Sequence, residues 1–148
     1  MRRARAVPLV LVLCGAVAAT GLSLAGRGGQ AVVFALGFLA VAAANSPVIF
    51  PRSVSASEAL RRSASDGRAV VYWRPGCAYC LRLRLRLGLR ARRLHWVDIW
   101  RDPDGAAVVR AANGGDETVP TVVVGGLPYV NPDPAWVRGL AAAGSQSS

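Results

Sequence analysis

The chain has 148 residues, a length that suits one globular domain with attached segments. Its formal charge is +10, and all 18 basic residues are arginines. No zinc-finger spacing or basic-region heptad accompanies this charge, which argues against a nucleic-acid-binding protein. The 3 cysteines are too few for a disulfide scaffold or a four-cysteine zinc site.

Two runs without any charged residue occupy most of the N-terminal part, Ala6–Ala25 and Ala31–Phe50. As a helix, each run would be roughly 30 Å long, enough to cross the hydrocarbon core of a bilayer. The short, turn-rich segment Gly26–Gln30 joins them. We therefore expect residues 1–52 to form a membrane hairpin with spans at about 6–25 and 31–50. The alternative is that the first run is a cleaved signal peptide.

Arginines near the ends of the two runs indicate the orientation of this hairpin. They precede the first run at Arg2, Arg3 and Arg5 and follow the second at Arg52, Arg61 and Arg62, with Arg27 between the runs. Both ends should therefore be cytoplasmic. The sequence predicts a multi-pass protein of the cell membrane, with two spans and a cytoplasmic C-terminal domain.

The remaining residues predict an α/β domain over 68–148 with a polar C-terminal tail, preceded by a linker at 53–67 that contains a short helix. Segments rich in apolar and β-branched residues predict four strands, at 68–74, 94–99, 121–124 and 127–130. Helices are expected over 102–115 and 133–144, where acidic residues stand at the start and glycines near the end. This order gives a small mixed four-stranded sheet covered by helices.

The segment CAYCLRLRLRLGLRARR, Cys77–Arg93, alternates leucine and arginine as a half-buried strand would. A helix also separates the leucines from the arginines onto different faces. Two further arguments favour the helix: leucine and arginine are good helix formers, and a connection between two buried strands needs a crossover helix. On that helix, one apolar arc contains Cys80, Leu83, Leu87 and Leu94, a second contains Leu81, Leu85 and Leu89, and the opposite face carries Arg82, Arg86, Arg90 and Arg93. The sequence therefore predicts a helix. Its arginine face could be solvated or could lie on an anionic membrane leaflet.

A helix that begins at Cys77 gives this cysteine its chemistry. Free backbone N–H groups and the helix dipole favour a thiolate, and Arg74 adds a positive charge three residues earlier. Cys80 lies one turn further on, within reach for a disulfide. The pattern predicts Cys77 as nucleophile and Cys80 as resolving thiol of a thiol–disulfide oxidoreductase.

The motif WRPGCAYC, the later segment NGGDETVPTVVVGG and the predicted strand order resemble glutaredoxins, especially the mycothiol-dependent mycoredoxins and related actinobacterial glutaredoxin-like proteins. The resemblance covers about 68–143 and implies a thioredoxin-like (glutaredoxin) fold. It implies mycothiol or glutathione as co-substrate, no bound cofactor or metal, and disulfide-containing proteins as substrates. It further implies a substrate-binding role for Arg74, for Tyr79 and for the loop Thr118–Val119–Pro120, with a cis bond before the proline.

One departure concerns the recycling thiol. Glutathione-binding glutaredoxins usually carry a second Gly-Gly before an acidic helix start, whereas Val130–Asn131–Pro132 precedes Asp133 here. Mycothiol, or a protein partner, therefore stays open. The competing functions are a non-enzymatic, membrane-anchored binding module, an extracytoplasmic disulfide-exchange protein if the topology is inverted, and an iron–sulfur carrier. Carriers of that kind usually lack the second cysteine.

Overall fold

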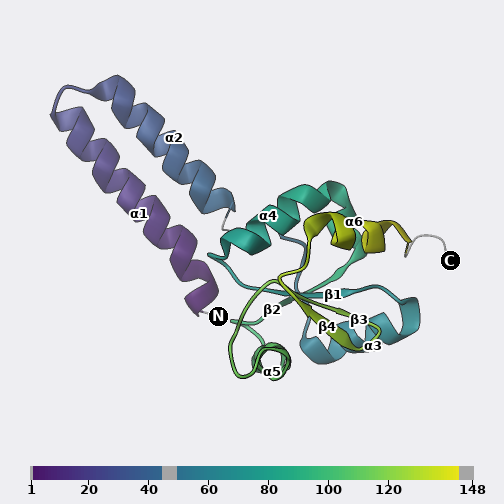
Figure 1. The fold of residues 1–148 in the computed structure, drawn as a ribbon. Coiled ribbons are helices and arrows are strands. Elements are labelled where there is room, and N and C mark those ends of the chain that lie inside the picture. Colours follow the sequence, from purple (N-terminus) through teal and green to yellow (C-terminus); the bar gives the residue numbers. More distant parts are fainter. Residues whose placement is uncertain (1, 45–49, 144–148) are drawn as a thin grey trace. The chain divides into compact units, whose positions relative to one another are not determined.

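The computed structural model describes residues 2–44 and 50–143, and the chain divides into two compact units, one before Phe50 and one from Phe50 onward (Figure 1). The first unit is a helical hairpin of α1 (Arg2–Leu24) and α2 (Gly28–Ala44). The two helices approach closely at Gly15, where an added Cβ would lie 2.6 Å from the Cβ of Phe38. The absence of a side chain at Gly15 therefore allows this close packing.

Within residues 2–44 and 50–143, no helix has both the length and the apolar character needed to cross a membrane. α2 has 17 residues. At about 1.5 Å per residue it extends for about 26 Å. Residues 45–49, which belong to the second predicted span, lie outside the described part of the chain. The helical hairpin is present, but the two membrane spans predicted at 6–25 and 31–50 are not supported by the structure.

The second unit is built on a four-stranded mixed sheet of β1 (Val70–Trp73), β2 (His95–Asp98), β3 (Thr121–Val124) and β4 (Leu127–Val130). The spatial order is β2-β1-β3-β4. β1 is parallel to β2 and antiparallel to β3, and β4 closes the edge antiparallel to β3. All four side chains of β1 are buried, as expected for a central strand covered on both faces. The predicted mixed sheet is confirmed.

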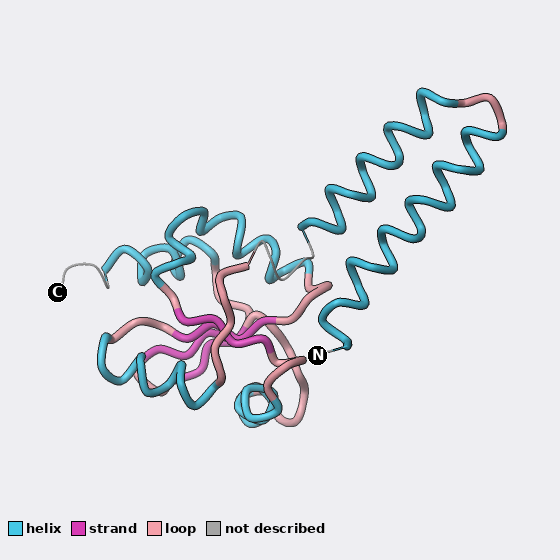
Figure 2. Tube along the Cα trace, turned by 180° about the vertical axis from the view of Figure 1, so that it is seen from behind, coloured by secondary structure: helices cyan, strands magenta, loops and turns pink. Residues whose placement is uncertain are grey.

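Helices cover both faces of this sheet (Figures 1 and 2). One face carries α4 (Ala78–Leu87), the 3-10 helix η1 (Gly88–Arg93) and α6 (Pro134–Ala143), and the other carries α3 (Ala56–Asp66) and α5 (Pro103–Ala112). The arrangement fits the thioredoxin-like fold that the sequence implied. A short loop after Trp73, the last residue of the buried strand β1, leads to α4, so this strand positions the start of the helix.

Residues 53–67, predicted as a linker, pack against the sheet through α3. Ala59 is fully buried, and Phe50 just before this segment stacks on Trp73 with ring centroids 3.8 Å apart. One carboxylate, that of Asp102, connects α3 to α5: it accepts hydrogen bonds from the backbone N–H of Ala56 (2.8 Å) and of Gly105 (2.9 Å). Asp102 therefore caps the first turns of two helices, and α3 belongs to the folded domain.

The leucine–arginine segment forms the predicted helix, but only one of its two leucine stripes is buried. The buried side chains of α4 are those of Cys80, Leu83 and Leu87. Leu85 and Leu89, from the second predicted stripe, are 67% and 81% exposed. The helix ends at Leu87, and the next residue is Gly88, whose φ of 55° suits a residue without a Cβ; from there the chain continues as η1. The sheet and α6 cover one side of α4, which leaves Leu85 and Leu89 in solvent and Leu81 half-buried.

Candidate active site

Cys77 is the N-cap residue of α4 and is half-buried. Its Sγ accepts a hydrogen bond from the backbone N–H of Cys80, at 3.2 Å. As a thiol, it donates a hydrogen bond to the carbonyl oxygen of Val119, at 3.3 Å. The turn that brings it there uses Gly76, whose φ is 81°. The sulfur therefore lies between the first turn of α4 and the loop that precedes β3.

Cys80 lies in the first turn of α4 and is completely buried. Both cysteines are free thiols. Burial, and then the neighbouring Cys77, raise the pKa of Cys80 well above its usual range. Cys80 therefore stays protonated while Cys77 ionises, and its S–H can donate a hydrogen bond to the Cys77 thiolate.

The environment lowers the pKa of Cys77 from 9.0 to about 6. The largest cause is the hydrogen bond from the Cys80 side chain, followed by the backbone N–H groups of Cys80 and Tyr79 and the charge of Arg74, while burial opposes the shift. At pH 7 a group with this pKa is about nine-tenths ionised. The sequence predicted a thiolate from the helix N-terminus first and Arg74 second, whereas in the structure the Cys80 side chain comes first and Arg74 last.

Arg74 lies at the end of β1 and is half-buried. Its guanidinium carbon lies 5.9 Å from the centroid of the Trp100 ring, which is a cation–π distance. Trp100 follows the end of β2, the strand parallel to β1, so the two residues meet at the same edge of the sheet. The sequence did not indicate this supporting role of Trp100, because only the pairing of β1 with β2 brings the two side chains together.

The loop Thr118–Val119–Pro120 faces Cys77 through the Val119 carbonyl. The Val119–Pro120 peptide bond is cis, as the family resemblance implied. The Thr118 carbonyl accepts a hydrogen bond from the hydroxyl of Thr121 at 2.8 Å, and the Pro120 carbonyl accepts one from the N–H of Asn131 at 2.8 Å. The two bonds anchor the loop to β3 and to the segment that follows β4.

A groove of about 290 Å³ begins beside this loop. It is lined by Tyr79, Arg82, Leu83, Pro120, Asn131, Pro132, Asp133 and Pro134. Tyr79 and Pro120 were predicted as site residues. The other predicted site residues are absent from the groove lining: Arg74, Cys77, Cys80, Thr118 and Val119. Arg82 and the segment 131–134 were not predicted to form the groove. The departure from the Gly-Gly pattern before Asp133 was the sequence signal that marked this segment.

Among residues 2–44 and 50–143, no three His, Cys, Asp or Glu side chains gather closely enough to hold a metal ion. The single histidine, His95, is half-buried and its Nε2 lies 2.9 Å from a carboxylate oxygen of Asp66, away from the groove lining.

Residues 69–128 match the glutaredoxin family model. No curated protein and no solved structure matches the chain. The matched segment contains β1, both cysteines of the CxxC motif, the loop with the cis proline and the start of β4. The match supports the glutaredoxin family for this domain and, in general terms, thiol–disulfide oxidoreductase activity. The segment Asn131–Pro134, which completes the lining of the groove, lies outside the matched residues, as does the N-terminal hairpin.

Proposed function

We propose that the chain is a membrane-tethered thiol–disulfide oxidoreductase that reduces disulfides through Cys77 and Cys80 and is recycled by a low-molecular-weight thiol. The observation that carries the proposal is the pairing of two thiols with opposite pKa shifts at the start of α4: the pKa of Cys77 is lowered to about 6, and that of the buried Cys80 is raised. A protein that only binds partners has no use for this pairing. We therefore favour an enzyme over a binding module.

The reaction begins when the Cys77 thiolate attacks one sulfur of a substrate disulfide. A Cys77–substrate disulfide forms, and the other substrate sulfur leaves as a thiolate that takes a proton from water. Cys80 then loses its proton and attacks Cys77, which releases the second substrate thiol and leaves a Cys77–Cys80 disulfide. Two molecules of a low-molecular-weight thiol reduce this disulfide and are themselves oxidised.

The groove beside Tyr79 and Pro120 is the proposed binding place of the recycling thiol. Its volume of about 290 Å³ suits a molecule of that class. When Cys77 is ionised or in a disulfide, it no longer donates its hydrogen bond to the Val119 carbonyl. That carbonyl can then accept a hydrogen bond from an amide of the bound thiol. Asn131 and Pro132, in place of a Gly-Gly pair, support a mycothiol-type thiol over glutathione.

Turnover of mycothiol and glutathione mixed disulfides, measured side by side with the full-length protein, tests the proposal. We expect turnover of both classes to depend on Cys77 and to be faster with mycothiol. Equal turnover would contradict the mycoredoxin-like assignment. Absence of turnover with either thiol, by a protein that is folded and fully reduced, would exclude the enzymatic function.

Membrane tethering is the part of the proposal that concerns the first unit. Large apolar side chains are exposed along both helices, among them Leu9, Leu13, Val17, Val33, Leu36 and Leu39. Apolar surface in contact with water is unfavourable by about 25 cal/mol per Å², so surfaces of this kind usually contact lipid or protein. We propose that the hairpin contacts lipid and that the catalytic domain faces the cytoplasm.

Membrane fractionation followed by an alkaline carbonate wash tests the tether, with recovery in the washed pellet as the expected result. A membrane-impermeant maleimide applied to intact and to lysed cells tests the orientation. We expect Cys77 to be labelled only after lysis, because the reagent does not reach a cytoplasmic domain in intact cells. The reducing cytoplasm is also the compartment that suits a disulfide reductase. Full labelling before lysis would favour the alternative of an extracytoplasmic disulfide-exchange protein.

A further inference from the structure

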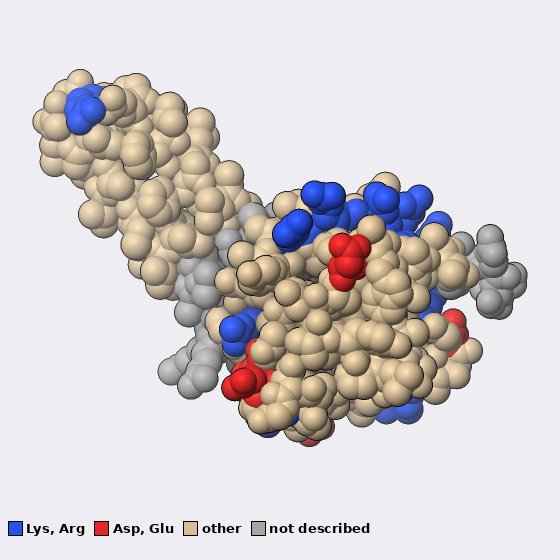
Figure 3. All heavy atoms as spheres, in the orientation of Figure 1, with Lys and Arg blue, Asp and Glu red and all other residues tan. Residues whose placement is uncertain are grey.

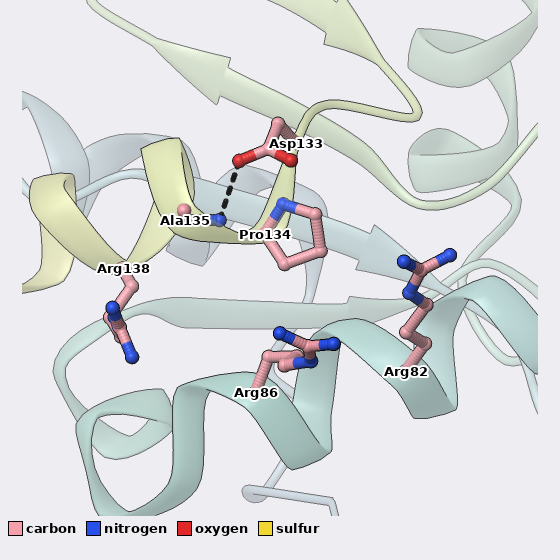
Figure 4. A pocket seen from close by; sticks show the side chains of 6 residues that line it. All are labelled: Arg82, Arg86, Asp133, Pro134, Ala135 and Arg138. Carbon is pink, nitrogen blue, oxygen red and sulfur yellow. Dashed lines mark hydrogen bonds between the residues drawn. The ribbon is translucent and has the colours of Figure 1, made fainter.

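Three arginines surround a recess next to the groove. The recess has a volume of about 90 Å³ and is lined by Arg82, Arg86, Asp133, Pro134, Ala135 and Arg138. Figure 4 shows Arg82 and Arg86 extending from α4 and Arg138 from α6 toward the space between the two helices. Figure 3 shows basic side chains gathered along the side of the domain where Figure 1 has α4 and α6. We call Arg82, Arg86 and Arg138 the arginine patch.

The arginine patch forms no ion pair within the described part of the chain. The ion pairs of the described residues involve other arginines and His95, and none includes Arg82, Arg86 or Arg138. Asp133 is the single carboxylate in the lining of the recess, and it accepts hydrogen bonds from the N–H groups of Ala135 (2.7 Å) and Trp136 (3.2 Å) at the start of α6. The patch therefore carries excess positive charge that a ligand can match.

The recess is continuous with the groove, because Arg82, Asp133 and Pro134 line both of them. From the N-cap Cys77 to Arg86 the axis of α4 rises about 14 Å. An extended peptide covers that distance with about four residues. A peptide whose sulfur is bonded to Cys77, and which follows the groove, therefore brings its side chains to the patch about four positions from its cysteine.

We infer that the arginine patch binds an acidic segment of a protein substrate, located about four residues from the cysteine that Cys77 attacks. The inference rests on the proposed function and deepens it by naming the substrate class. Guanidinium groups from two helices around one recess match carboxylates, which they can bind in a bidentate manner. The concave position beside the groove favours a peptide over a flat membrane surface. Binding there orients the substrate before Cys77 attacks.

The test uses two peptides, each closed by one disulfide, that differ only in a Glu-Glu or Gln-Gln pair four residues from a cysteine. Reduced full-length protein in excess is mixed with each peptide. For every peptide disulfide reduced to two thiols, one Cys77–Cys80 disulfide forms, and the second-order rate constant is measured. We expect the acidic peptide to react about fivefold faster at low salt, from two exposed charge pairs. This preference should decrease strongly at about 0.5 M salt, because the Debye length is then only a few Å and exposed charges are screened from one another.

The double variant Arg86→Gln/Arg138→Gln should reduce the preference to less than about twofold. Arg90→Gln/Arg92→Gln removes the same charge from η1, outside the recess lining, and should keep the preference. Equal rates for both peptides with the wild-type protein, or equal losses in the two double variants, would overturn the inference. A preference that persists in Arg86→Gln/Arg138→Gln would overturn it as well.

Two further measurements distinguish failure of this inference from failure of the proposed function, and peptide binding from lipid binding. All proteins should reduce the small neutral disulfide 2-hydroxyethyl disulfide at the same rate, and failure of the wild type here would refute the proposed function itself. Co-sedimentation with vesicles of phosphatidylcholine, with and without phosphatidylserine, tests the membrane as the ligand of the patch. If Arg86→Gln/Arg138→Gln loses binding that depends on phosphatidylserine but keeps the peptide preference, the patch binds lipid and the inference fails.

Discussion

Replacement of Cys80 by alanine removes the hydrogen bond that lowers the pKa of Cys77 most. The backbone N–H of residue 80, 3.2 Å from Sγ of Cys77, remains in place. A hydrogen bond to a charged group contributes about 1.5–3 kcal/mol. One pKa unit corresponds to about 1.4 kcal/mol. We therefore expect the pKa of Cys77 to rise from about 6 by about one to two units in Cys80→Ala.

The rate of iodoacetamide alkylation as a function of pH measures this value. Cys14 is exposed on α1 and would react as well, so every protein in the series carries Cys14→Ala. Cys80→Ser is the matched control, because its hydroxyl can still donate a hydrogen bond to the thiolate, and its midpoint should stay closer to that of the wild type. Arg74→Gln should cause a smaller rise than Cys80→Ala, since Arg74 is the last of the causes.

Two results would refute this reasoning. A wild-type midpoint near 9 would mean that the surroundings of Cys77 do not stabilise the thiolate at all. An unchanged midpoint in Cys80→Ala, together with a large rise in Arg74→Gln, would mean that the positive charge and not the neighbouring thiol activates Cys77. That outcome would make Arg74 more important than the sequence predicted, because the sequence placed it second to the helix N-terminus.

The remaining predictions concern the division of labour between the thiols and two structural residues. Cys77→Ser should abolish reduction of every disulfide, while Cys80→Ser should spare release of a small thiol from a mixed disulfide and slow reduction of protein disulfides; equal losses on both substrates would contradict these roles. Asp102→Ala removes one cap from α3 and one from α5, each of which contributes about 1 kcal/mol. The free energy of unfolding, measured by urea denaturation, should therefore decrease by about 2 kcal/mol. A decrease of only a few tenths of a kcal/mol would show that water replaces the caps. Gly105→Ala would bring a Cβ to 2.7 Å from Cγ1 of Val97 and should destabilise the domain by about 1–3 kcal/mol in the same assay, unless β2 and α5 move apart freely.

Local patterns in the sequence predicted the strands of the domain and most of its helices, although not the change to a 3-10 helix at Gly88. The four strands were predicted because Val70–Trp73 and Thr121–Val124 consist of β-formers, and the turn-forming Gly125–Gly126 separates the last two. The helix after Cys77 was predicted against its strand-like alternation, because leucine and arginine have high helix propensity and the topology needs a crossover. These inferences depend on neighbours in the chain, and the sequence contains those directly.

The cause of activation at Cys77 was decided by tertiary structure. Helix geometry fixes the backbone N–H groups near the sulfur, but the orientation of the Cys80 side chain depends on what buries it. The Val119 carbonyl reaches Cys77 from 42 residues away, and Arg74 meets Trp100 through strand pairing. Contacts of this kind arise from packing between elements that are distant in the chain, and residue spacing alone does not determine them.

The same distinction separates the two faces of the leucine–arginine helix. From the sequence alone, both leucine stripes could be buried, and the arginine face could be solvated or lie against a membrane. In the structure α4 packs on one side only, so Leu83 is buried and Leu85 is exposed. The approach of α6 then brings Arg138 to the recess that Arg82 and Arg86 line. Sequence determined that these residues form a helix, and the packing of α4 against α6 decided which of them meet, because a helix alone does not specify which neighbour covers each face.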